Sequence, residues 1–289
     1  MAKRKVGIYY AYWTHDWDAD FVPYVRKVAK LGFDILEVNS GTVATMSSAA
    51  RRELRDVADG EGIDLSYCIG LTADYDVASA DHATRERGIG YLKQMAGAIG
   101  EMGGGRLSGI IYGAWPASLP EGETDKQPYF DRSVESMRVA APAAEENGVL
   151  FNVEVVNRFE QYLLNCAEEA VEYVNAVDSE AVKVLLDTFH MNIEEDTVAG
   201  AVRTVDGLLG HLHIGENNRK PPGNGHIPWD ELGDALDEID YDGYIVMEPF
   251  LMPGGEVGRD IKVFRDLSVG VDLDEEAKNA CAFVKAKLG

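Results

Sequence analysis

Four acidic or histidine side chains recur at regular intervals in the second half of the chain, each at or near the end of a short apolar run. Consecutive members are separated by about the length of one strand and one helix, which places them on successive parallel strands. In a closed barrel the C-terminal ends of all strands share one face, where the active sites of such barrels lie. The spacing therefore predicts that four side chains converge on one point: Glu154, Asp187, His213 and Glu248.

Three carboxylates and one imidazole make an oxygen-rich ligand set, which suits Mn²⁺, Mg²⁺ or Co²⁺ better than a metal that prefers thiolates. Four protein ligands leave about two octahedral positions open for adjacent oxygens of a sugar, whose carbonyl the metal would polarise as a Lewis acid. A single acid at a strand end is more often a helix cap or an ion-pair partner, but several buried carboxylates without a cation are costly. We therefore expect one divalent metal per subunit at this point.

Further polar side chains follow these strands in loops on the same face. Glu160, His190 and Arg219 are expected to bind substrate hydroxyls or to hold the metal ligands through hydrogen bonds. His211 lies two residues before His213 and so points to the same side of the strand. We interpret His211 as structural or as a support for the ligands.

Aromatic side chains occur where the first and fourth expected strands end. Tyr9 and Trp13 lie on or just after the first strand, and Trp115 follows the fourth. Such rings stack on the C–H faces of sugars in binding pockets, although they also pack in barrel cores. Tyr9 and Trp115 are therefore expected to contact substrate.

Short β-rich runs alternate with longer helical patterns along the whole chain. Strands are expected at residues 6–12, 35–38, 63–68, 107–112, 150–155, 182–186, 211–214 and 244–247. Helices are expected at 20–31, 47–62, 81–103, 132–148 (with a kink at Pro142), 165–177, 198–208, 229–239 and 275–288, and the longest irregular segment at 116–128. This alternation predicts a single (β/α)₈ barrel domain over residues 1–289. An open doubly wound sheet would need a glycine-rich turn after the first strand, which is absent at 9–13.

Composition argues against several classes of protein. Of the 289 residues, 46% are hydrophobic, which allows a large core and argues against disorder. No apolar run approaches the ~20 residues that span a bilayer, so no membrane association is expected. The net charge of −23 argues against a duplex nucleic-acid partner. Because the acidic residues are spread along the chain, they indicate a solvated surface or adaptation to a salty cytoplasm.

The start of the chain and its cysteines bear on location. Basic residues at 3–5 could begin a signal peptide, but the segment 6–13 that follows is too aromatic and is interpreted as a strand. The three cysteines are widely spaced, which favours neither a disulfide framework nor a zinc cluster. A cytoplasmic protein is expected.

Four segments around these residues closely resemble the ketose 3-epimerases, the family of D-allulose (D-psicose) 3-epimerase and D-tagatose 3-epimerase. They are 154–160 (EVVNRFE), 186–196 (LDTFHMNIEED), 210–219 (GHLHIGENNR) and 246–250 (VMEPF). The segments 7–13 and 30–37 fit as well, so the likeness covers essentially the whole chain. Segments 70–79 and 221–228 match only loosely, which leaves the preferred sugar open.

The resemblance implies a (β/α)₈ barrel of the xylose-isomerase-like superfamily that forms a homodimer or homotetramer and uses Mn²⁺ or Co²⁺, with Mg²⁺ also working. It implies that the four converging residues ligate the metal. It further implies that Glu160, His190 and Arg219 bind the substrate, a small ketose sugar.

The implied reaction inverts C3 of a ketose, such as D-allulose and D-fructose, through a cis-enediolate. Inversion needs a base on each face of the carbon, and Glu154 and Glu248 are the expected pair. Alternatives are a D-tagatose or other ketose 3-epimerase, an aldose–ketose isomerase, and a non-enzymatic sugar-binding protein. A DNA-repair endonuclease of the same superfamily would need a histidine-rich three-zinc site, against which the six histidines and the acidic charge argue.

Overall fold

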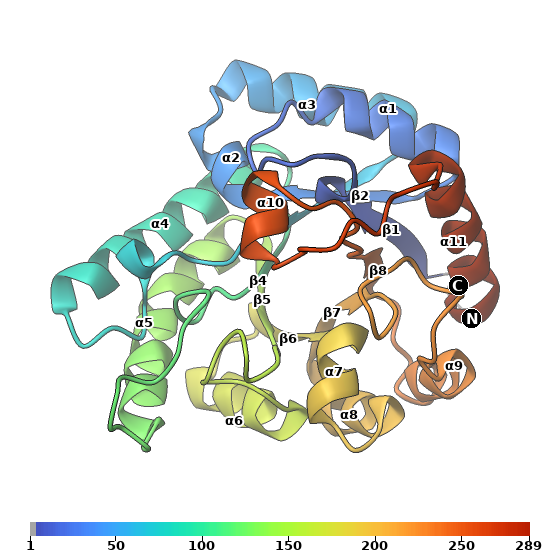
Figure 1. The fold of residues 1–289 in the computed structure, drawn as a ribbon. Helices are drawn as coiled ribbons and strands as arrows, with labels where there is room; N and C mark the ends of the chain where they lie inside the picture. Colours follow the sequence, from blue (N-terminus) through green and yellow to red (C-terminus); the bar gives the residue numbers. More distant parts are fainter. Residues whose placement is uncertain (1–3) are drawn as a thin grey trace.

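The strands form a closed parallel barrel in the computed structural model, which describes residues 4–289 (Figure 1). Each strand pairs with its neighbours in chain order, and β1 pairs with β8 to close the ring. The predicted fold class is confirmed. The strands are β1 Lys5–Tyr9, β2 Ile35–Asn39, β3 Asp64–Cys68, β4 Gly105–Gly109, β5 Val149–Glu154, β6 Val182–Asp187, β7 Leu209–Ile214 and β8 Tyr244–Met247.

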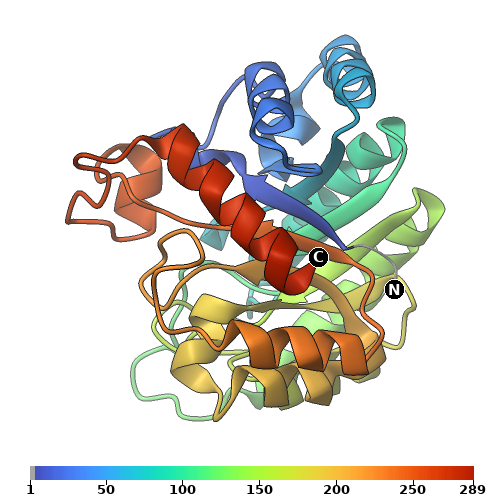
Figure 2. The same ribbon diagram turned by 90° about the vertical axis from the view of Figure 1, so that its right-hand side faces the viewer.

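Helices surround the barrel, and most of them lie between successive strands (Figure 1). Seen from the side, α11 crosses the outer wall of the barrel, and the segment between β8 and α11 extends beyond one end of it (Figure 2). The longer helices are α1 Val22–Leu31, α3 Ser48–Glu61, α4 His82–Glu101, α5 Gln127–Glu146, α6 Ala167–Val177, α8 Val198–Val205, α9 Trp229–Glu238 and α11 Leu273–Leu288. Within residues 4–289, no helix has the length and apolar character needed to cross a bilayer.

The strands and helices form where the sequence places apolar residues between clear stop signals. Most of the strands are largely apolar because a barrel covered by helices buries both of their faces, although β4 has the sequence GRLSG. Helix α1 buries Val25 and Val28 against the core and ends at Gly32, whose φ of 88° is the left-handed conformation that glycine adopts readily. On β1, a Cβ at Gly7 would lie 2.6 Å from Ile35 Cβ, so this position lets two strands approach closely.

Two strands end three residues earlier than predicted. The first ends at Tyr9, and Tyr10–Trp13 form a short 3₁₀ helix, η1, because Tyr10 turns to pack against Phe21 at 4.9 Å between ring centroids. The fourth ends at Gly109, where φ is 113° and a Cβ would lie 2.2 Å from the Ile69 carbonyl oxygen. Such a backbone conformation ends regular pairing, so the predicted extension to 112 is wrong.

The sequence did not predict five short helices. They are α2 Ser40–Thr45, α7 Thr188–Glu194, α10 Gly255–Asp260, η1 and η2 Ala73–Tyr75. The short helix η3 Asp206–Leu208 falls inside the helix that was expected at 198–208. Helix α5 begins at Gln127, with Pro128 in its first turn, and so takes up the end of the segment predicted to be irregular. It continues through Pro142, where the expected kink stays a prediction. The signal-peptide question falls partly on residues 1–3, which lie outside the described residues.

Candidate active site

The four side chains predicted to converge do lie together at the C-terminal end of the barrel. Glu154 and Asp187 are the last residues of β5 and β6, His213 is on β7, and Glu248 directly follows β8. Each offers a ligand atom, and these atoms all lie within 4.8 Å of one another. His213 Nδ1 is 3.5 Å from Glu154 Oε1 and 3.9 Å from Glu248 Oε1. All except Glu248 are fully buried, and only a small part of the Glu248 side chain is exposed.

The charge of this cluster is not balanced by protein groups alone. Burial raises the pKa of Glu248 to about 8, although the positive charges of His213 and Arg219 oppose the rise. The neighbouring Glu154 and Asp187 carboxylates add to the rise. A bound divalent cation would supply the missing positive charge and favour the ionised carboxylates.

The donor set fits such a cation. Among the residues described, the buried Nδ1 atom of His213 has no hydrogen-bond partner, and it faces the carboxylates. Three carboxylate groups and one imidazole nitrogen within one ligand-sized space are the hard, oxygen-rich donors that Mn²⁺, Co²⁺ and Mg²⁺ accept. The residues present therefore fit the metal that the sequence predicts.

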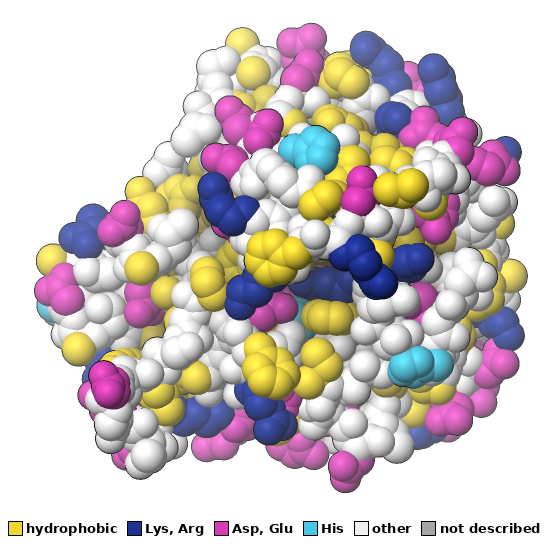
Figure 3. Space-filling model, in the orientation of Figure 1, with side chains coloured by type: hydrophobic (Ala, Val, Ile, Leu, Met, Phe, Trp, Pro, Cys, Tyr) yellow, Lys and Arg dark blue, Asp and Glu magenta, His cyan; other side chains and the backbone are white. Residues whose placement is uncertain are grey.

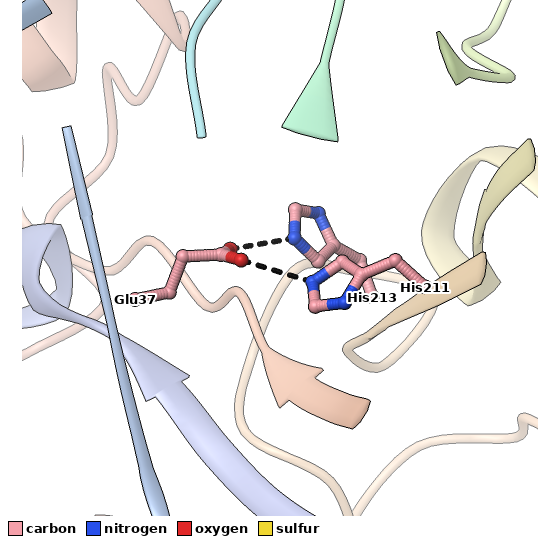
Figure 4. A group of neighbouring side chains, drawn as sticks. All are labelled: Glu37, His211 and His213. Atoms are coloured by element: carbon pink, nitrogen blue, oxygen red, sulfur yellow. Dashed lines mark hydrogen bonds and ion pairs between the residues drawn. The ribbon is translucent and has the colours of Figure 1, made fainter. Parts of the chain in front are cut away.

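A second group lies on the other side of the His213 ring (Figure 4). Glu37 Oε1 is 2.6 Å from His213 Nε2, and Glu37 Oε2 is 2.9 Å from His211 Nε2. Burial raises the pKa of Glu37, but the two histidines and their hydrogen bonds more than offset this and hold the pKa well below its usual range. His211 was expected to be structural or supporting, and it lies against Glu37. Glu37 was missed as a functional residue, although an acid inside the apolar run of β2 was a signal.

Arg219 joins the candidate ligands to a nearby carboxylate. Its Nη2 is 3.1 Å from Glu248 Oε2, and its Nη1 is 3.7 Å from Glu160 Oε1. The guanidinium lies over the rings of Phe189 and Phe250, 4.5 and 5.1 Å from their centroids. Burial raises the pKa of Glu160, but the charges of Arg219 and His190 and the hydrogen bonds from Trp115 and Asn157 together outweigh burial and lower the pKa to about 2, so Glu160 is ionised. An ionised acid and a fixed guanidinium can each bind sugar hydroxyls.

His190, on α7, points toward the same carboxylate cluster. Its Nε2 lies 3.7 Å from Asp187 Oδ2 and 4.0 Å from Glu154 Oε1. The backbone N–H of Asn157 donates to His190 Nδ1 at 3.1 Å, so the ring carries its proton on Nε2, toward the site. The Asn157 side chain also donates to Glu160 Oε1 at 3.1 Å. Asn157 lies within the motif 154–160, but no role for it was predicted from the sequence.

A cavity of about 410 Å³ opens onto these groups. In the space-filling view of this face, a hollow near the middle is bordered by hydrophobic and basic side chains (Figure 3). Tyr9 and Trp115, which are expected to contact substrate, both line the cavity, and the Trp115 indole donates to Glu160 Oε2 at 2.9 Å. Trp13 does not line it but packs against Tyr24, and Trp17 occupies the wall instead. The volume is in the range of small-molecule sites.

Fold and site together define the class. Residues 25–267 match the family model described as xylose isomerase-like TIM barrel. The chain is 47% identical to a D-psicose 3-epimerase of Ruminiclostridium cellulolyticum over 98% of both chains. It is 44% identical to a D-psicose 3-epimerase of Agrobacterium fabrum over 99% of both.

Solved structures give the same result. A D-psicose 3-epimerase from Clostridium cellulolyticum H10, solved with D-tagatose, has a TM-score of 0.95 and 47% identity, covering 98% of this chain and 99% of that one. A second D-psicose 3-epimerase, solved in the presence of D-fructose, has a TM-score of 0.95 and 44% identity over 99% of both chains. Within the xylose isomerase-like barrels, the chain belongs to the D-psicose 3-epimerase family, whose members are isomerases.

Proposed function

We propose that this protein is a metal-dependent ketose 3-epimerase that interconverts D-allulose (D-psicose) and D-fructose. Its metal, one per chain, is Mn²⁺ or Co²⁺, with Mg²⁺ as the alternative, held by Glu154, Asp187, His213 and Glu248. The observation that carries the proposal is that two carboxylates, Glu154 and Glu248, line one sugar-sized cavity and also contact one imidazole nitrogen. Relatives of this chain solved with D-tagatose and with D-fructose support a ketose as the substrate.

Inversion at C3 requires that a proton leave one face of the carbon and that another arrive on the opposite face. A divalent metal bound by the four ligands would supply Lewis-acid stabilisation to the oxygens of the ketose. One of Glu154 and Glu248 takes the C3 proton to give the cis-enediolate, and the other, protonated, returns a proton to the opposite face. In the reverse direction the two glutamates exchange roles.

The remaining polar groups orient the sugar. Glu160 accepts hydrogen bonds from hydroxyls, while His190 Nε2–H and the Arg219 guanidinium donate to oxygens near the reacting carbon. Tyr9 and Trp115 form apolar walls around the remaining carbon atoms of the sugar and exclude water.

The direct test uses chelator-treated protein reloaded with Mn²⁺ and incubated with D-allulose in D₂O. The expected result is D-fructose that carries deuterium at C3, measured by chromatography and mass spectrometry. Formation of an aldose, or deuterium at C1, would support the aldose–ketose isomerase instead. Faster turnover of D-tagatose than of D-allulose would reassign the preferred sugar, and binding of ketose without turnover would support a sugar-binding protein.

We further propose that the protein acts in the cytoplasm as a homodimer or homotetramer. The three cysteines are free, which is usual in a reducing compartment. Phe159 and Phe264 are 71% and 83% exposed, and a subunit interface that covers them would remove their apolar surface from water. Light scattering coupled to size-exclusion chromatography tests the assembly, and a monomer at micromolar concentration would contradict it.

A further inference from the structure

The ring of His213 has a different partner on each edge. Nδ1 faces Glu154 and Glu248 in the cavity, whereas Nε2 faces Glu37 inside the barrel (Figure 4). Glu37 is completely buried on β2 and does not line the cavity. Its role therefore cannot be direct contact with substrate.

The Glu37 carboxylate is fixed by contacts to both of its oxygens. Oε1 is 2.6 Å from His213 Nε2. Oε2 accepts a hydrogen bond from the Ser66 hydroxyl at 2.7 Å and lies 2.9 Å from His211 Nε2. Burial of a carboxylate is costly unless such partners satisfy it, and here every oxygen has one. The group is held in one position.

Glu37, His211 and His213 could be mistaken for a second metal site, because their ligand atoms are also close together. Two ligand atoms that share one metal at ~2.1 Å from it are separated by roughly 3 Å or more. The 2.6 Å between Glu37 Oε1 and His213 Nε2 leaves no space for a metal between them but is suitable for a hydrogen bond. The trio is therefore a hydrogen-bonded support.

We propose that Glu37 is a positioning residue for His213: it accepts the Nε2–H of the ring and so keeps the lone pair of Nδ1 directed at the carboxylate cluster. A neutral imidazole carries one N–H, and a hydrogen bond to one nitrogen leaves the other nitrogen free to bind a metal. A carboxylate acceptor also makes the ligand nitrogen more basic, which strengthens the metal bond. The inference rests on the metal site of the proposed function.

The first test measures Mn²⁺ affinity by titration calorimetry on chelator-treated protein without sugar. Glu37→Leu removes the acceptor and should weaken Mn²⁺ binding by about 10- to 100-fold, with Glu37→Gln, which keeps one oxygen, in between. Ser66→Ala is the matched control, because it removes a bond to the same carboxylate but leaves the contact with His213 intact. It should bind Mn²⁺ much like the wild type.

The second measurement is made on the wild-type protein, so it does not depend on whether a variant folds. In the Mg²⁺-loaded wild type, long-range ¹H–¹⁵N correlation spectra should place the His213 proton on Nε2. A proton on Nδ1, a second Mn²⁺ per chain, or unchanged affinity in Glu37→Leu would overturn the inference while leaving the proposed function intact. A wild type that binds no divalent metal would overturn both.

Discussion

The His213 ring has carboxylates on both sides: Glu37 on the inner side, and an outer cluster of Glu154, Asp187 and Glu248 on the cavity side. The two sides differ in how the negative charge is balanced. On the inner side, the single carboxylate of Glu37 has two histidines and a hydroxyl as partners. On the cavity side, three carboxylates share one imidazole and one guanidinium. The Glu37 carboxylate is balanced by partners within the protein, whereas the cavity-side cluster has more carboxylates than basic partners, an arrangement that a bound cation would complete. The difference supports the proposal that the cavity-side cluster reacts and that Glu37 holds it in place.

Removal of the metal should have the largest effect, because only the outer cluster depends on it. Chelator-treated protein should lose all measurable epimerisation and also thermal stability, since a ligand at 100 to 1,000 times its Kd stabilises the fold by about 3–4 kcal/mol. Mn²⁺ or Co²⁺ should restore both, as measured by activity and calorimetric melting. Full activity in protein shown to be metal-free by elemental analysis would refute the site.

Substitution of Glu154 or Glu248 should cause the second-largest loss of activity. Glu154→Gln and Glu248→Gln keep the shape but cannot take a proton, so each should reduce kcat by at least about 10²–10⁴-fold. One variant should still exchange the C3 hydrogen of one epimer with D₂O, because half of the proton path survives. Metal occupancy must be matched by elemental analysis. A metal-loaded Glu248→Gln variant that epimerises at near the wild-type rate would exclude the two-base mechanism.

Smaller effects on activity are expected for residues beside the outer cluster that are proposed to bind substrate but not the metal. Arg219→Ala and Glu160→Ala should each lower kcat/KM by about 10- to 100-fold, the range expected for lost hydrogen bonds to charged groups. Metal content should remain largely intact. Arg203→Ala is the control, because Arg203 forms an exposed ion pair with Glu238 away from the cavity. A variant of Arg219 or Glu160 that purifies without metal would move that residue into the ligand set.

The smallest expected effect is a change in the stability of the metal-free protein with pH. In metal-free protein, burial raises the pKa of Glu248 from 4.5 to about 8, so the folded state holds its proton more tightly than the unfolded state does. Stability should therefore fall as pH rises from about 4.5 to about 8. Burial lowers the pKa of His213, but the charges of Glu37 and Glu248 raise it well above 6.5, so its contribution is also lost as pH rises.

Melting temperatures at pH 6 and pH 8.5, with and without Mn²⁺, measure this dependence. The metal-free protein should melt at a lower temperature at pH 8.5, and Mn²⁺ should reduce the difference. Glu248→Gln, which cannot ionise, should also reduce it. A metal-free profile that is unchanged by Glu248→Gln would show that the outer carboxylates are already balanced.

The sequence predicted the barrel and the outer cluster for the same reason: each functional residue stands at the end of an apolar strand, and parallel strands bring such ends together. The roles of these residues in catalysis stay predictions. Glu37 was missed because its one sequence signal, an acid inside the apolar run of β2, does not reveal its contact with His213, which lies 176 residues away in the chain. Trp13 was named and Trp17 was not, because the short helix η1 after β1, which the sequence did not predict, affects which of these rings faces the cavity.

Closure of the ring by β1 and β8 has a consequence for the order of events during synthesis. The first strand leaves the ribosome long before its partner, and its paired edge remains open until almost the whole chain has been made. Glu248 directly follows β8, so the outer cluster is completed at the same late step. A nascent chain that stops before β8 therefore exposes two unpaired edges, of β1 and β7, and lacks one of the four proposed metal ligands.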